Sequence, residues 1–146
     1  MSKPANPVET TDNLQDQTMQ RSNTDNAPRS AIHQTLYSAD TFVQHDYIAG
    51  KNLPDIVRPQ EGQINWLHFV GINDVTLLKH ALEPYGIHEL VIEDILSRKQ
   101  RPKIEDYGSY VFTAAQVYHY TSTGKLHSDQ VYVIIGKDFV LSFQQK

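Results

Sequence analysis

The sequence predicts a single α/β (α+β) domain, in which a β-sheet carries helices on at least one face. Three observations lead to this prediction. Strand-like runs lie at both ends of the region after residue 30, two helix-like segments lie between them, and short polar turns join neighbouring strands. The chain has 146 residues, a length typical of one domain that can bury its own core.

Composition divides the chain at residue 30. Residues 1–30 contain six apolar residues and no aromatic residue, whereas every Trp, Tyr and Phe lies in 31–146. A segment so poor in apolar surface cannot offset the entropy lost on ordering, so we expect 1–30 to be a disordered polar tail. Residues 31–146 are expected to form the folded domain. The tail lacks the apolar stretch of a signal peptide.

Charge and composition argue against several classes of function. The formal net charge of -4 gives no reason to expect nucleic acid or an anionic membrane surface as a partner. The sequence contains no cysteine, which excludes disulfides, thiolate nucleophiles and cysteine-based metal sites. Its longest apolar run, residues 131–135, is far shorter than the roughly 20 residues that span a bilayer.

Six segments have the β-branched, aromatic and aliphatic character of strands. They are residues 32–37, 42–48, 64–70, 110–118, 130–135 and 139–143. Tight polar turns predict that the first two segments and the last two form hairpins, around Ser38-Ala39-Asp40 and Gly136-Lys137-Asp138. Gly71 is expected to end the third strand.

Two helices are expected between the third and fourth strands. Asn73 and Asp74 predict the N-cap of the first, which extends to Pro84. Its apolar residues recur at helical spacing and are Leu77, Leu78, Ala81 and Leu82. Gly86 separates it from a second helix at about 88–96. The predicted apolar face of this second helix consists of Leu90, Val91 and Ile95.

The most informative residues for function are two adjacent carboxylates, Glu93 and Asp94, in the second helix. Asp94 falls at the edge of the apolar stripe and in the last turn, where the helix dipole favours cations. A positive group should therefore compensate it. Either Arg98 or Arg101 forms a salt bridge with it, or a divalent cation binds to Asp94 with help from Glu93. Two carboxylates leave most of a Mg²⁺ shell to waters or to acids from another chain.

The sequence contains no catalytic motif. The seven histidines occur in no standard zinc spacing, so each is expected at the surface or in a turn. A metal-assisted enzyme built from His88, Glu93 and Asp94 has no nucleophile or general base at a workable spacing. Gly86-Ile87-His88 is more simply the end of one helix and the start of the next. We therefore do not expect an enzyme.

Several segments together match a known family in order, spacing and identity. They are Ile64-Asn65-Trp66-Leu67-His68-Phe69 before Gly71, Tyr85-Gly86-Ile87-His88, Leu90-Val91-Ile92-Glu93-Asp94-Ile95-Leu96, Gln100-Arg101-Pro102-Lys103-Ile104-Glu105-Asp106-Tyr107, Tyr110-Val111-Phe112, and the segment from Gln130-Val131 to Phe143-Gln144. With these segments, residues 64–146 resemble the amino-terminal cytosolic domain of the CorA family of magnesium and cobalt transporters.

The resemblance implies a mixed, mostly antiparallel sheet with helices packed on its faces. In the family, a long stalk helix and two membrane-spanning helices with a Gly-Met-Asn pore motif follow this domain. The family forms a homopentameric ion channel, which Mg²⁺ bound between neighbouring protomers holds closed. One ligand of that regulatory site falls on Asp94, and Glu93 matches an acid at a secondary ion position. The implied ion is Mg²⁺, with Co²⁺ as the alternative, and no organic cofactor is implied.

The stalk, the membrane helices and the pore motif do not follow in this sequence. The chain is therefore expected to be the soluble part of a longer transporter, either shortened deliberately or truncated naturally. In the full-length protein it would lie on the cytoplasmic side of the inner cell membrane, and would reach the membrane only through the absent C-terminal region. Its partners would be divalent cations and the other protomers, and not nucleic acid. The alternative is a stand-alone interaction or structural domain with no role in ion sensing.

Overall fold

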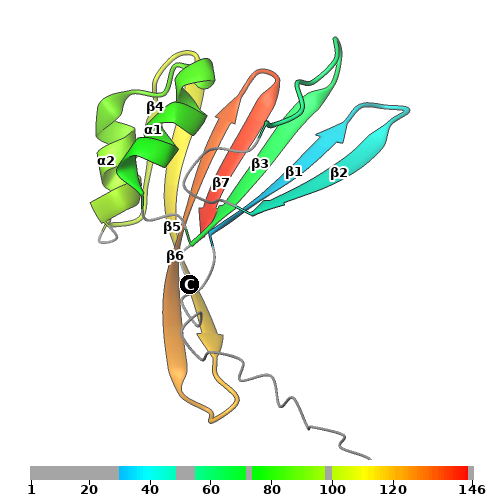
Figure 1. Cartoon of the computed structure of the whole chain (residues 1–146). Helices are drawn as coiled ribbons and strands as arrows, with labels where there is room; N and C mark the ends of the chain where they lie inside the picture. Colours follow the sequence, from blue (N-terminus) through cyan, green and yellow to red (C-terminus); the bar gives the residue numbers. More distant parts are fainter. Residues whose placement is uncertain (1–29, 49–54, 72–73, 98–99, 145–146) are drawn as a thin grey trace, which may run out of the picture.

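The computed structural model describes residues 30–48, 55–71, 74–97 and 100–144. Within them, seven strands form one twisted sheet in the order β2-β1-β3-β7-β6-β5-β4 (Figure 1). Neighbouring strands are antiparallel except for β3 and β7, which are parallel, and this confirms the expected mixed, mostly antiparallel sheet. The strands are β1 (Ala31–Tyr37), β2 (Phe42–Ile48), β3 (Ile64–Val70), β4 (Lys103–Asp106), β5 (Tyr110–Tyr120), β6 (Leu126–Gly136) and β7 (Phe139–Gln144).

Local sequence signals account for the strands of the first half. β1 and β2 form the predicted hairpin, in which the Ser38 N–H donates to the Thr41 carbonyl at 2.9 Å. β3 covers the predicted residues and ends at Gly71, whose φ of 66° lies in the left-handed region that glycine adopts without strain. The predicted tail lies outside the described residues apart from Ser30.

The last three strands partly correct the sequence prediction. The hairpin of β6 and β7 is confirmed, but β5 and β6 are both longer than predicted. In the described chain, residues 116–120 of β5 and 126–130 of β6 pair only with each other. These two segments therefore project from the sheet as a two-stranded ribbon (Figure 1). Most side chains of this ribbon are exposed, so it lacks the apolar alternation by which a strand is recognised.

Two helices occur among the described residues, α1 (Val75–Leu82) and α2 (Glu89–Ser97). The Asp74 carboxylate accepts hydrogen bonds from the Thr76 and Leu77 backbone N–H groups at 2.8 and 3.0 Å, which confirms it as the N-cap of α1. Asn73 lies outside the described residues. A 3-10 turn, η1 (Glu83–Tyr85), follows and ends at Gly86 with a φ of 60°.

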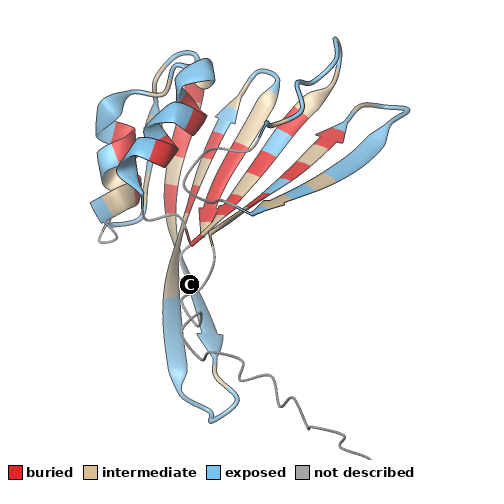
Figure 2. Cartoon of the chain, viewed as in Figure 1, coloured by how far each residue is buried: buried red, intermediate tan, exposed pale blue. Residues whose placement is uncertain are grey.

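The core lies between one face of the sheet and both helices (Figure 2). Strand register places the buried apolar side chains of β1, β3, β7, β6 and β5 on this face, whereas the buried Ser142 of β7 lies on the opposite face beside His68. The helices contribute Leu77, Leu78, Ala81, Leu82, Val91, Ile92 and Ile95. The predicted face of α2 was wrong at Leu90, which is 57% exposed, because the helix packs with Ile92 inward instead.

Candidate functional site

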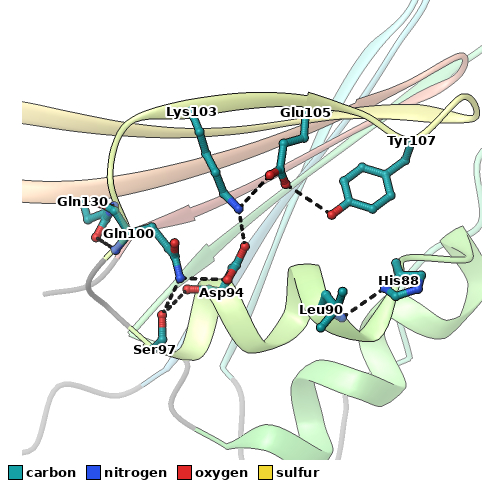
Figure 3. A network of polar contacts seen from close by, with 9 residues as sticks. All are labelled: His88, Leu90, Asp94, Ser97, Gln100, Lys103, Glu105, Tyr107 and Gln130. Carbon is teal, nitrogen blue, oxygen red and sulfur yellow. Dashed lines mark hydrogen bonds and ion pairs between the residues drawn. The ribbon is translucent and has the colours of Figure 1, made fainter.

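Asp94 lies in the last turn of α2 and faces the edge strand β4 (Figure 3). One carboxylate oxygen, Oδ2, accepts a hydrogen bond from Lys103 Nζ at 2.7 Å. The other, Oδ1, accepts one from Gln100 Nε2 at the same distance of 2.7 Å. The Asp94 side chain is 22% exposed and that of Lys103 28% exposed, so this ion pair is partly shielded from water. Both oxygens of Asp94 are therefore occupied by donors from its own chain.

Lys103 also bonds to a second carboxylate. Its Nζ donates to Glu105 Oε1 at 3.0 Å, and the Tyr107 hydroxyl donates to the other oxygen of Glu105 at 3.2 Å. Alternation along β4 brings Lys103 and Glu105 to the face that the helices cover. The hydrogen bond to Asp94, with a smaller contribution from Glu105, raises the pKa of Lys103. We call these five side chains, Asp94, Gln100, Lys103, Glu105 and Tyr107, the Asp94 cluster.

Gln100 is held in place by β6. Its backbone N–H donates to Gln130 Oε1 at 3.1 Å, and the Gln130 side-chain amide donates back to the Gln100 carbonyl. The Gln100 side chain also donates to Ser97 Oγ, whose hydroxyl donates to the Asp94 carbonyl. The end of α2 is thus tied to the sheet at the point where Asp94 lies.

Glu93, the second predicted ligand, lies apart from this cluster. Adjacent residues of a helix point about 100° apart, and Glu93 is exposed. Its charge acts on Lys79 of α1, whose pKa is raised chiefly by Glu89 and to a lesser extent by Glu93. Within the described residues, no three His, Asp or Glu side chains are arranged to hold a metal ion. The assignment of Asp94 and Glu93 as ligands stays a prediction.

The positive group that the structure pairs with Asp94 is Lys103, which was not among the residues considered from the sequence. The structure places Lys103 there instead of Arg101, and Arg98 lies outside the described residues. The missed signal is the alternation of Lys103 and Glu105, which is typical of a charged edge strand. His88 caps α2, as expected from its position, because its Nδ1 accepts a hydrogen bond from the Leu90 N–H at 3.2 Å.

A buried hydroxyl lies within electrostatic reach of the cluster. Tyr132 of β6 is fully buried, and within the described part of the chain its hydroxyl has no hydrogen-bond partner. Burial raises the pKa of Tyr132, and the negative charge of Asp94 raises it further. In the sequence, Tyr132 is marked only by its place in the predicted strand 130–135.

A second polar network, also missed from the sequence, is buried between β1 and β3. Gln34 and Asn65 are 1% and 2% exposed. The Gln34 side-chain amide donates to Asn65 Oδ1 at 2.9 Å and to the Val57 carbonyl at 2.7 Å, while Gln34 Oε1 accepts from the Tyr47 hydroxyl at 3.0 Å. These bonds tie the loop at Val57 to the sheet, which is a structural role.

Comparison with known sequences connects the chain to one family of transporters. A family model described as CorA-like Mg²⁺ transporter protein matches residues 61–146. The cobalt/magnesium transport protein CorA of Thermotoga maritima is 40% identical over 82 residues, which cover 56% of this chain and 23% of that protein. The putative metal ion transporter YfjQ of Bacillus subtilis is 33% identical over 97 residues, covering 64% of this chain and 28% of that protein.

Solved structures share the fold at low sequence identity. The full-length CmaX protein superposes with a TM-score of 0.57 at 14% identity, over 84% of this chain and 37% of that chain. The complete CorA magnesium transporter of Methanocaldococcus jannaschii gives a TM-score of 0.55 at 10% identity, over 82% of this chain and 33% of that chain. Its soluble domain gives 0.55 at 11% identity, over 79% of this chain and 40% of that chain.

These matches cover only part of each relative, since the chain spans about a quarter of the length of the two curated proteins. In the part of the chain that the structure describes, no helix has the length and apolar character needed to cross a membrane. The family model nevertheless covers more than half of the sequence, and the relative from Thermotoga maritima carries the CorA name. The chain therefore belongs to the CorA-like Mg²⁺ transporter family.

Proposed function

We propose that this chain is the cytosolic divalent-cation-sensing domain of a CorA-like magnesium/cobalt transporter. In this proposal, Mg²⁺ bound between protomers at Asp94 gates the channel, and Co²⁺ is the alternative ion. Family membership supports ion transport by the longer protein rather than enzymatic activity. The observation that carries the sensing role is the position of the Asp94 carboxylate. It lies at a helix end that disfavours negative charge, and it already pairs with the positive ammonium group of Lys103.

Binding of Mg²⁺ at Asp94 requires exchange with Lys103. The ammonium occupies Oδ2 at 2.7 Å, so a metal ion at that oxygen must displace it. Mg²⁺ prefers oxygen ligands and keeps several of its waters, and Asp94 and Glu105 offer carboxylates close to that position. With so few protein ligands, the isolated chain should bind Mg²⁺ only at about millimolar concentrations, the range of weak oxygen sites.

The remaining ligands would come from a neighbouring protomer of a homopentamer. Asp94 is partly exposed, so a carboxylate of a second chain has access to an ion bound there. Glu93 is exposed on the adjacent side of α2 and serves in this proposal as a secondary ion position. The domain would lie on the cytoplasmic side of the inner membrane, and the longer protein would supply the membrane-spanning part.

Amide NMR shifts during Mg²⁺ and Co²⁺ titration test the proposal. We expect saturable shifts in α2 and β4 that disappear in Asp94→Asn, which keeps a hydrogen-bond acceptor at this position. Lys103→Met should have the opposite effect and strengthen binding, because it removes the competing cation. Glu105→Gln separates a local contribution of the second carboxylate from that of Asp94. Equal responses of the natural chain and Asp94→Asn would refute sensing at this residue.

The second candidate function is a stand-alone interaction or structural domain. It is favoured by the same contacts, because Lys103 and Gln100 already satisfy both oxygens of Asp94. On this interpretation the cluster only fastens α2 to β4. Lys103→Met would then lower the thermal stability of the chain and leave the cation titration unchanged, which distinguishes the two functions in one set of variants.

A further inference from the structure

We propose that the two-stranded ribbon of β5 and β6 carries a transition-metal site formed by His119, His127 and Asp129. This site goes beyond the proposed function, because its residues lie on other elements than Asp94 and supply nitrogen donors. The ion it fits is Zn²⁺ or a neighbouring divalent ion such as Ni²⁺. Imidazole nitrogen suits these ions, whereas Mg²⁺ takes oxygen ligands.

Strand register brings the three residues onto one face of the ribbon. His119 of β5 is directly opposite His127 of β6, and Asp129 follows His127 by two residues on the same strand. Residues two apart on a strand share a face, and directly opposed residues have Cβ atoms about 5 Å apart. The three side chains therefore occupy adjacent positions on one surface.

Two pairs of donor atoms are separated by about the distance between two ligands of one ion, although the three side chains do not yet converge on a common point. His119 Nδ1 lies 3.6 Å from Asp129 Oδ2, and His127 Nε2 lies 3.4 Å from Asp129 Oδ1. Ligands about 2.0–2.1 Å from a tetrahedral Zn²⁺ are roughly 3.3–3.4 Å from one another. Both separations are longer than a good hydrogen bond to a carboxylate. This spacing is better suited to a shared ion than to two direct hydrogen bonds.

Closing the site needs only a rotation of exposed side chains. The centroids of the two imidazole rings are 5.3 Å apart and the ring planes meet at 66°. Each ring faces a different oxygen of Asp129. Among the described residues, three such donors do not yet converge on one point. The side chains of His119 and His127 are 48% and 59% exposed, so surrounding packing leaves their rings free to turn. Solvent water completes the coordination.

A bound ion would crosslink the part of the sheet that has least support. In the described part of the chain, the ribbon beyond Ala115 and Gln130 pairs only with itself (Figure 1). An isolated two-stranded hairpin is marginally stable in water. An ion that joins β5 to β6 stabilises the paired state by mass action. We expect metal binding to order this ribbon.

The sheet contains a second pair of opposed histidines that serves as a matched control. His33 and His68 are stacked with their centroids 6.1 Å apart, but each ring is engaged separately. His33 Nδ1 pairs with Asp46 at 2.7 Å, and His68 Nδ1 bonds to Ser142 Oγ at 2.8 Å. These residues lie in a row, so their ligand atoms do not surround a common point.

The experiment is calorimetric titration of Zn²⁺ into the full chain without a polyhistidine tag, with imidazole NMR signals recorded in parallel. We expect one saturable ion per chain and shifts at His119 and His127. His119→Gln and His127→Gln should each weaken binding at least about tenfold, since losing even an outer-shell partner of a ligand costs that much. His33→Gln and millimolar Mg²⁺ should leave binding unchanged.

Three results would overturn the proposal. They are the absence of saturable Zn²⁺ binding, equal affinity of the natural chain and both ribbon variants, and a stoichiometry of one ion per two chains. Circular dichroism of each variant checks that the substitution of an exposed histidine leaves the fold intact. The Mg²⁺ titration at Asp94 is independent of these outcomes, so failure of either proposal is recognised separately.

Discussion

Replacing Tyr132 by Phe should stabilise the fold. Tyr132 is fully buried, and no partner for its hydroxyl is found among the described residues. A buried polar group left unsatisfied costs about 1–3 kcal/mol. The substitution removes this group and keeps the ring, which stacks on Phe112 with centroids 6.1 Å apart and planes 8° apart. We expect a gain of about 1 kcal/mol, at the low end of that range because a small void remains.

Tyr110 on the neighbouring strand provides a control of opposite sign. It is 4% exposed, but its hydroxyl oxygen accepts a hydrogen bond from the His88 N–H at 2.9 Å, at the start of α2. Tyr110→Phe leaves that N–H without its partner, so we expect a loss of about 1–2 kcal/mol. The same chemical change at two buried tyrosines should therefore shift stability in opposite directions.

Urea and thermal denaturation followed by circular dichroism measure both effects. For a domain of this size, 1 kcal/mol corresponds to roughly 4 °C in Tm. Because burial raises the pKa of Tyr132, the unfolded state ionises first above about pH 10, and stability falls as pH rises further. This fall should be shallower in Tyr132→Phe. The reasoning is refuted if Tyr132→Phe destabilises the chain as much as Tyr110→Phe does.

Three further predictions concern the cap of α1, the β6–β7 turn and the face of the sheet opposite the helices. Asp74→Ala removes the acceptor for two backbone N–H groups and should cost about 1 kcal/mol in urea denaturation. Gly136→Ala should lower Tm, because a Cβ there collides with the Phe139 ring. Burial, and then the charge of His33, lower the pKa of His68. The stabilising contribution of neutral His68 is thus complete above about pH 6.5 and is lost as pH falls. His68→Asn should therefore flatten the pH dependence of the free energy of unfolding between about pH 7 and pH 5. An unchanged slope in that variant would contradict the effect.

The parts of the fold that the sequence predicted are those set by local signals. The hairpin of β1 and β2 follows from alternation and a polar turn, and α1 follows from the Asp74 cap and a single apolar face. In α2, such local signals do not suffice to predict which apolar residues are buried. In a helix of nine residues, Leu90 and Ile92 both extend the apolar stripe, and only packing against the sheet selects Ile92.

Strand register is the information that local patterns lack. Lys103 reaches Asp94 because β4 pairs with β5 at the sheet edge. Three charged residues with the single apolar Ile104 among them give little sign of a strand. His119 and His127 are eight positions apart, a spacing that corresponds to no metal motif. They become neighbours only through the pairing of β5 with β6. Candidate sites on this domain therefore depend on pairing between strands more than on motifs.

The occupied state of Asp94 also bears on how a sensor of this kind would respond. Lys103 is bound by two carboxylates of its own chain, and these contacts raise its pKa, so the ammonium is a permanent competitor for Mg²⁺. A further carboxylate from a neighbouring protomer strengthens the binding of a divalent ion more than that of a monovalent ammonium group, because Coulomb energy scales with charge. On our proposal, Mg²⁺ displaces Lys103 readily only when protomers meet. The lysine thereby couples ion binding to assembly, and Lys103→Met should weaken that coupling by letting a single chain bind the ion.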